Sequence, residues 1–309
     1  NGETLSVTGA SATAGISTPT PVVFSPDPLC NPLPAGTFSG EIVICNRGVI
    51  GRIAKGFNVS QAGASGMILR NLVVQDVETD NHFIPSVHLD GPEGDQVVAF
   101  VNSHTGVTAT FTPGVATEVE GDVMASFSSR GGPGQQLGIS KPDVTAPGIQ
   151  ILAGHTPLPA TPDGGLPGQL FQAIAGTSMS SPHVAGAAAL LKDLHPDWTP
   201  GQIKSALMTS GETDDVKKED GETDADAFDR GSGRIDLDEA GNPGLTIDES
   251  AADYLALETA LWKANYPSLF HPNLPGIFTV QRTVKDVTGA SATWEIETDT
   301  DHSDWKIIV

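Results

Sequence analysis

The segment with the clearest chemical potential lies between residues 176 and 191, where a serine stands at the start of an expected helix. It reads Gly-Thr-Ser-Met-Ser-Ser-Pro-His-Val-Ala-Gly-Ala-Ala-Ala-Leu-Leu. A turn of small residues brings Ser178 to the first helical turn, where backbone N–H groups lack helical acceptors and the helix dipole favours a developing oxyanion. These are the conditions that a serine nucleophile needs in acyl transfer. A serine at a helix start is more commonly an N-cap, so position alone does not separate the two roles.

The residues around Ser178 exclude one nucleophile geometry and supply no general base. The nucleophile elbow G-x-S-x-G needs glycine at position 180, where Ser180 stands. His183 follows five residues after Ser178, which places it about 140° around the helix, so its ring cannot reach the hydroxyl. We therefore interpret His183 as a structural histidine.

Two helices are expected in the region that carries this serine. The first covers about residues 178–195, is rich in Ala and Leu, and is stopped by Pro196. The second begins at Thr199, an N-cap candidate, with Pro200 at the first helical position and Gln202 completing a capping box. These elements would hold Ser178 on a rigid support.

The first 120 residues predict a small α/β or α+β module. Strand-like apolar runs bounded by Gly, Pro, Asn or Asp occur at residues 21–24, 41–45, 66–69 and 84–89. Helical spacing of apolar residues occurs at about 50–62 and 92–101. Strands that alternate with helices in this way are typical of such modules.

The last region, from about residue 242, predicts the opening of an antiparallel β domain. Two runs, 276–284 and 292–298, alternate between apolar and polar residues. That alternation is typical of strands with one face buried.

Charge and hydropathy exclude two classes of partner. The chain of 309 residues carries 38 acidic against 16 Lys and Arg residues, for a formal charge of −22. Duplex nucleic acid and anionic membrane surfaces both require basic patches. No apolar run approaches the roughly 18 residues of a transmembrane helix. The chain begins at Asn1 without a signal-peptide pattern, so we expect a piece of a longer protein.

Two cysteines, Cys30 and Cys45, are the only ones in the chain. No histidine or further cysteine stands near them at metal-ligand spacing. They form either a disulfide in an exported protein or two buried free thiols, and we expect the disulfide.

The serine segment closely resembles the signature of subtilisin-like serine proteases (subtilases), in which Gly-Thr-Ser-Met precedes a Pro-His-Val-Ala-Gly helix. A second match lies at residues 125–131 and 141–148, and the following residues 149–153 look like the next strand of that family. Several blocks agree in order and spacing, so the resemblance extends well beyond one motif.

Two further regions carry resemblances of their own. Residues 38–48 and 61–69 resemble the protease-associated (PA) domain that larger subtilases insert between their catalytic His and Ser. The region from 242 to 284 resembles the start of the fibronectin-III-like domain of plant cucumisin-type subtilases. The resemblance thus implies an α/β chain in three parts: a PA domain over 1–120, the C-terminal half of a subtilisin-like parallel-sheet domain over 121–241, and the truncated beginning of a fibronectin-III-like domain over 242–309.

The resemblance implies a secreted serine endopeptidase that cleaves protein or peptide substrates through an acyl-enzyme on Ser178. The Ser178 backbone N–H is one expected oxyanion donor, and no cofactor is required. The family's Asp and His motifs and its oxyanion Asn have no match here, and the triad order Asp, His, Ser places them upstream of Asn1. We therefore expect this chain to be inactive alone, with its own N-terminal half as a candidate partner.

No resident histidine replaces the missing base. His155 lies near an expected strand end but matches no catalytic position of the family, and His82, His88 and His104 belong to the first 120 residues. The alternative function is a non-catalytic protein-binding module, in which the PA domain recruits or gates protein substrates and the serine region is a scaffold.

An acidic segment at residues 211–229 is a candidate calcium site, because many subtilases use calcium for stability. The calcium candidates are Asp214, Asp224 and Asp226. The spacing fits no EF-hand loop, and a solvated acidic surface explains the segment more simply. Separately, Asn58-Val-Ser60 fits an N-glycosylation sequon, although chance matches of this motif are common.

Overall fold

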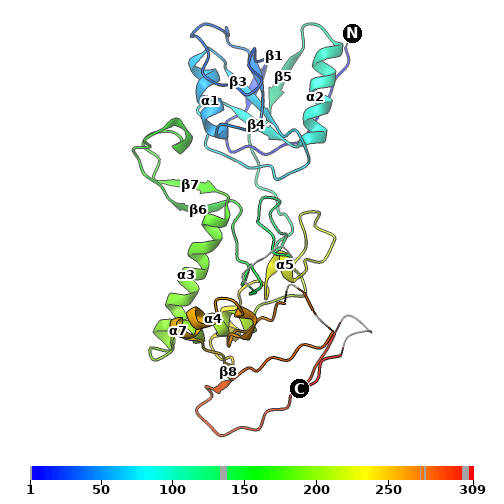
Figure 1. Ribbon diagram of the computed structural model, residues 1–309. Helices are drawn as coiled ribbons and strands as arrows, with labels where there is room; N and C mark the ends of the chain where they lie inside the picture. Colours follow the sequence, from blue (N-terminus) through cyan, green and yellow to red (C-terminus); the bar gives the residue numbers. More distant parts are fainter. Residues whose placement is uncertain (1, 133–137, 272, 275, 301–305) are drawn as a thin grey trace. The chain divides into compact units, whose positions relative to one another are not determined.

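The computed structural model describes residues 2–132, 138–271, 273–274, 276–300 and 306–309 (Figure 1). The chain divides into two compact units. The first comprises Asn1–Ser129, Ala146–His183 and Lys217–Thr223, and the second comprises Arg130–Thr145, Val184–Val216 and Asp224–Val309. None of the helices in the described part of the chain combines the length and apolar character needed to cross a membrane.

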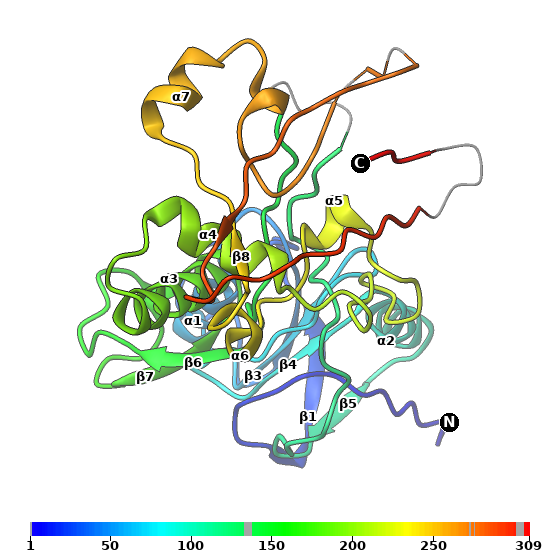
Figure 2. The same ribbon diagram turned by 90° about the horizontal axis from the view of Figure 1, so that it is seen from below.

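A five-stranded, mainly parallel sheet forms the centre of the first unit. Its strands are β1 (Ile16–Phe24), β2 (Ile42–Asn46), β3 (Gly66–Arg70), β4 (Ser86–Leu89) and β5 (Thr108–Phe111), in the spatial order β4-β3-β2-β1-β5. Strands β1 to β4 run parallel, and β5 pairs antiparallel with β1, beside which Figure 2 shows it. The α/β fold class is confirmed by this sheet and its helices.

Helices cover both faces of the sheet. Because successive side chains of a strand point to opposite faces, β2 contributes to a core cluster on each face. On one face, Val43 of β2 packs in a core cluster with Val59 of α1 (Arg52–Gln61). On the other face, Ile44 packs in a cluster that Val97 of α2 (Gly91–Ser103) covers. Burial on both faces explains why β2 and β3 are continuous apolar runs in the sequence.

The predicted strands and helices of this region are confirmed, and two strand starts differ from the prediction. The strand predicted at 84–89 begins at Ser86. β1 begins at Ile16 rather than near residue 21, because Thr20 and Pro21 pair with the antiparallel neighbour β5. Cys30 and Cys45 form a disulfide with a Cα–Cα distance of 5.7 Å. Both cysteines are fully buried in the cluster beneath α1.

A β-hairpin precedes the helix that carries Ser178. It pairs β6 (Ile151–Gly154) antiparallel with β7 (Phe171–Ile174), and the loop between them contains a 3-10 turn, η1 (Pro162–Gly164). The helix α3 (Thr177–Leu194) follows β7 after two residues. Figure 1 shows β6, β7 and α3 as consecutive green elements.

The second unit is built around α4 (Pro200–Thr209) and the C-terminal part of α3. Their core contains Ala187, Leu191, Trp198, Ile203, Ala206, Leu207 and Ala240. The predicted capping box is confirmed: the Gln202 backbone N–H donates to Thr199 Oγ1 at 3.1 Å, and the Thr199 N–H donates to Gln202 Oε1 at 3.2 Å. The short elements α5 (Ala227–Arg230), α6 (Leu237–Ala240), α7 (Ala251–Ala256) and η2 (Leu261–Lys263) follow along the chain.

The two strands predicted at 276–284 and 292–298 are not formed in the described residues. Instead, the two-residue strands β8 (Leu245–Thr246) and β9 (Lys285–Asp286) pair antiparallel. An alternating run becomes a strand only when neighbours bond its backbone and another layer covers its apolar face. Here Ile277 and Ile296 are exposed, so no layer covers the apolar face. The described residues of the two runs also form no ladder with a neighbouring strand.

Candidate active site

Ser178 lies inside the first turn of α3 and is exposed to solvent. Because α3 begins at Thr177, Ser178 is a helical residue and not the N-cap, which removes the simpler explanation of its position. Among the described residues its hydroxyl has no hydrogen-bond partner. Its backbone N–H belongs to the first turn, where no preceding helical carbonyl is available to accept it. A hydroxyl and a helix N-terminus are therefore presented together.

The turn before Ser178 is fixed by backbone contacts. The Gly176 N–H donates to the Gly148 carbonyl at 2.8 Å, and the Met179 N–H donates to the Gly176 carbonyl at 2.9 Å. A Cβ atom at Gly148 would lie 2.3 Å from the Ser180 hydroxyl and 3.0 Å from the Gly176 carbonyl oxygen, so a larger residue here would force the turn or the Ser180 side chain to shift. The segment at 148 and the nucleophile turn thus form one tightly packed junction.

None of the described histidines is hydrogen-bonded to Ser178. His183 Nδ1 lies 2.8 Å from the Met179 carbonyl, in agreement with its expected structural role. His155 Nε2 lies 2.6 Å from the Gly164 carbonyl and closes the loop between β6 and β7. His82, His88 and His104 all lie in the N-terminal sheet region, as expected, and His88 and His104 are hydrogen-bonded there.

The acidic candidates for calcium are exposed side chains in the second unit. Asp226 caps α5, accepting the Phe228 N–H at 2.7 Å, and Asp214 accepts the Thr213 hydroxyl at 3.3 Å. Asp224 is exposed as well. Within the described ranges no group of three or more His, Cys, Asp or Glu side chains is arranged to hold a metal ion. By contrast, Asp229 of the same acidic segment is buried and paired with Arg130 at 3.3 Å.

The sequon asparagine has a structural role. Asn58 lies within α1, and its Nδ2 donates to the Cys30 carbonyl at 3.0 Å. Lys55, one turn earlier, is fully buried and donates to the carbonyls of Leu29 and Gly48. The two side chains therefore hold the segments next to the disulfide, and burial lowers the pKa of Lys55.

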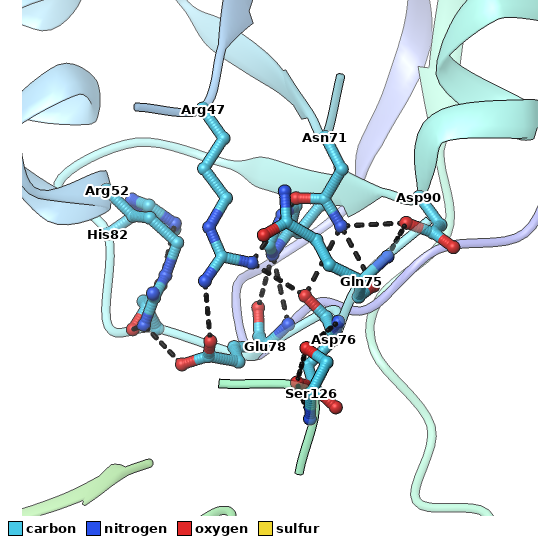
Figure 3. Close-up of polar contacts among 11 residues, drawn as sticks. Arg47, Arg52, Asn71, Gln75, Asp76, Glu78, His82, Asp90 and Ser126 are labelled. Atoms are coloured by element: carbon cyan, nitrogen blue, oxygen red, sulfur yellow. Dashed lines mark hydrogen bonds and ion pairs between the residues drawn. The ribbon is translucent and has the colours of Figure 1, made fainter. Parts of the chain in front are cut away.

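A buried cluster of charges surrounds the loop that connects β3 to β4 (Figure 3). Glu78 accepts hydrogen bonds from Arg47 at 3.2 Å and from Arg52 at 2.5 Å, and Arg52 Nε also donates to Asp80 at 2.6 Å. Both carboxylates are only 3% exposed. Burial raises the pKa of Glu78, and the two guanidinium groups oppose that effect.

His88 completes this cluster as a neutral ring. Its Nδ1 accepts the Glu78 N–H at 3.0 Å, and its Nε2 donates to Asn71 Oδ1 at 2.8 Å. Burial lowers the pKa of His88 to about 4, and nearby Arg47 and Arg52 add to the effect. Because these groups are paired with one another, the cluster fixes the shape of the loop rather than offering a reactive group.

The polar contacts that join this loop to the hairpin region have no counterpart in the sequence predictions. Thr79 contacts Gln150, and Asn81 contacts Gln169. Isolated polar residues in loops form no period and no motif, so the sequence carries no signal from which these contacts could be found.

Comparisons with known proteins agree with the resemblance drawn from the motifs. Residues 58–233 match the Subtilase family, and residues 8–97 match the PA domain. The chain is 44% identical over 179 residues to Subtilisin-like protease SBT1.6 of Arabidopsis thaliana, covering 55% of this chain and 23% of that protein. It is 39% identical over 218 residues to Subtilisin-like protease SBT1.4 of the same plant, covering 66% and 28%. With Subtilisin-like protease SBT5.4 it shares 34% identity over 289 residues, covering 82% and 37%. The matches therefore span about a quarter to a third of these relatives.

Proposed function

Because the chain belongs to the subtilase family, we propose that it carries the nucleophile-bearing part of a secreted serine endopeptidase, with Ser178 as the nucleophile. The observation that carries this proposal is the exposed Ser178 hydroxyl at the first turn of α3, without a capping role. The buried disulfide supports the export of the protein, since such bonds persist in oxidising compartments.

In the proposed reaction, Ser178 Oγ attacks the carbonyl carbon of a peptide bond while a general base takes the hydroxyl proton. The Ser178 backbone N–H donates to the oxyanion of the tetrahedral intermediate. Collapse of that intermediate expels the amine, which receives the proton, and leaves an acyl group on Ser178. Water then releases the acyl group by the reverse sequence. No cofactor takes part in any of these steps.

We assign the base, its orienting carboxylate and the second oxyanion donor to a segment N-terminal to this chain. The absence of a histidine hydrogen-bonded to Ser178 among the described residues supports this assignment. Exposed apolar side chains around the hairpin support it as well, since Leu152 is 71% exposed and Phe171 is 64% exposed. The 309-residue chain is accordingly inactive alone and acts on protein or peptide substrates only when that segment is present.

The test compares the full-length protein with the 309-residue chain, using a serine-directed fluorophosphonate probe and a peptide substrate. We expect the probe to label Ser178 of the full-length protein and to leave the isolated chain unlabelled. Ser178→Ala in the full-length protein removes labelling and lowers kcat about 10⁴-fold or more. Ser181→Ala, one turn further along α3 and also exposed, is the matched control and retains both.

The rival function is a non-catalytic binding module in which the PA domain recruits protein substrates. Its support is the exposed apolar loop residues Val73 and Val74. Full peptidase activity in Ser178→Ala would refute the assignment of Ser178. A full-length protein that shows neither probe labelling nor hydrolysis of the peptide would favour the rival function. Labelling of the isolated chain would refute the assignment of the base to another segment.

A further inference from the structure

Residues 76–81 of the PA domain form a loop segment, called the tether loop below, that is anchored to the domain and also makes polar contacts with later segments. Glu78 is bound by Arg47 and Arg52 of the same domain (Figure 3). Asp80 is bound by Arg52 as well. These ion pairs therefore hold the tether loop against the PA domain.

Thr79 and Asn81 of the tether loop contact segments that lead to Ser178. The Gln150 side-chain amide makes two hydrogen bonds to Thr79. The Gln150 amide oxygen accepts the Thr79 N–H at 2.7 Å, and the Gln150 amide nitrogen donates to the Thr79 hydroxyl at 2.9 Å. Asn81 Nδ2 donates to Gln169 Oε1 at 2.7 Å. These two contacts bind the residue just before β6 and a residue two positions before β7.

A third contact extends the attachment to another segment. The Asp76 carboxylate accepts the Ser126 N–H at 3.0 Å and also accepts the Ser126 hydroxyl (Figure 3). The Asp76 carbonyl accepts a hydrogen bond from Arg47 at 2.7 Å, so this end of the tether loop is also anchored to the PA domain.

The path from these contacts to the nucleophile is short. Gln150 stands two residues after Gly148, whose carbonyl accepts the Gly176 N–H two residues before Ser178. Gln169 lies two residues before β7, and β7 pairs with β6 so that Ile151 is opposite Ile174. A shift of Gln150 or Gln169 would therefore move the backbone of the β6–β7 hairpin. The residues that flank this hairpin, Gly148 and Gly176, are hydrogen-bonded to each other at the nucleophile turn.

We propose that Thr79 and Asn81 are positioning residues for Ser178, acting through Gln150, Gln169 and the β6–β7 hairpin. The inference rests on the proposed function of Ser178 but concerns the PA domain, whose role here is to hold the nucleophile turn in register. The contacts act on the geometry of the attacking hydroxyl and not on the surface that receives the substrate. Their loss therefore lowers kcat and leaves KM nearly unchanged.

The first measurement does not depend on activity. Amide hydrogen exchange is followed in the 309-residue chain for Thr79→Val with Asn81→Leu, for Thr79→Ser, and for Thr110→Val, an exposed threonine on β5 that serves as the control. We expect exchange at Gly176 and along β6 and β7 to rise about five- to tenfold in the double variant only. Unchanged exchange in β2 and β3 shows that the PA domain remains folded. Exchange at Gly176 equal to that of Thr110→Val overturns the inference.

The second measurement uses the full-length protein and a peptide substrate. The double variant is expected to lose about five- to tenfold in kcat with KM within about twofold, and Thr79→Ser is expected to retain the activity of the unsubstituted protein. An active double variant with unchanged kcat, despite faster exchange at Gly176, also overturns the inference. If exchange responds as expected while the unsubstituted full-length protein shows no Ser178-dependent hydrolysis, the tether stands and the proposed function fails.

Discussion

Replacement of the buried His82 by leucine is expected to lessen the acid destabilisation of the PA domain by about 2 kcal/mol between pH 7 and pH 5. The His82 side chain is 4% exposed, and its Nδ1 has no hydrogen-bond partner among the described residues. Burial lowers the pKa of His82 to about 4; attraction by Asp80 opposes this effect, and repulsion by Arg52 adds to it. The ring is therefore neutral in the fold at pH 5, whereas in the unfolded chain it is protonated.

The sign and size of the effect follow from proton linkage. A histidine whose pKa falls from 6.5 to about 4 on folding contributes stability above pH 6.5, and this contribution is lost as the pH falls toward 4. Between pH 7 and pH 5 the loss is about 2 kcal/mol for one such histidine. His88, with the same lowered pKa, adds a similar loss, so these two histidines together account for a loss of about 4 kcal/mol over this range.

The assay is native-state hydrogen exchange at the Met67 and Leu69 amides of β3, corrected for the intrinsic exchange rate at each pH. We expect the fall in the opening free energy from pH 7 to pH 5 to be about 2 kcal/mol smaller in His82→Leu than in the unsubstituted chain. At pH 7 the two differ little, because the lost ring makes no hydrogen bond through Nδ1.

His104→Leu is the control with the opposite sign. A hydrogen bond to Glu3 raises the pKa of His104, so its contribution is present at low pH and is lost as the pH rises. Removing it cannot lessen the loss in acid. Glu78, with its raised pKa, gains a proton in the fold as the pH falls, but it is common to all variants and cancels in their difference. Equal acid sensitivity in His82→Leu and the unsubstituted chain would refute this reasoning.

Three further changes test the structural assignments. Replacing Cys30 and Cys45 by serine is expected to lower the unfolding free energy of the PA domain by about 3 kcal/mol, measured by urea titration, because the bond closes a loop with a sequence separation of 15. Asn58 is expected to carry no glycan when the protein is made in a glycosylating host, as read by mass spectrometry, because it lies in α1 with its amide bonded to Cys30. Thr199→Ala is expected to cost about 1 kcal/mol and to raise amide exchange in the first turn of α4, where the Gln202 N–H loses its acceptor.

The sequence predicts well those elements whose signals are local. Thr199 and Gln202, three residues apart, form a capping box that predicts the start of α4, and Pro196 predicts the end of α3. The buried strands β2 and β3 are likewise read from continuous apolar runs, because both of their faces are covered. Ser178 was found by its motif, and the structure adds that it lies within the helix rather than at its cap.

The sequence predicts poorly whatever depends on distant neighbours. The alternating run at 276–284 has the pattern of a strand, but its described residues lack the neighbouring strands that would pair with them. Thr79 meets Gln150 across 71 positions of the chain, and no local pattern reports such a pair. The acidic segment was expected to be solvated, yet Asp229 is buried because Arg130 lies beside it.

Because the Cys30–Cys45 disulfide is buried, an external thiol can reduce it only if the thiol reaches one of the sulfur atoms. Exchange requires a thiolate to approach one sulfur in line with the bond, and here neither cysteine has any exposed surface. Lys55 and Asn58 hold the backbone on either side, so no small fluctuation of a side chain uncovers the sulfurs. Reduction therefore requires α1 to lift from the sheet, and its rate depends on the population of that open state as well as on the reductant. Reduction of the Cys30–Cys45 bond therefore reports opening of the PA domain, because the bond is reduced only after the domain has opened.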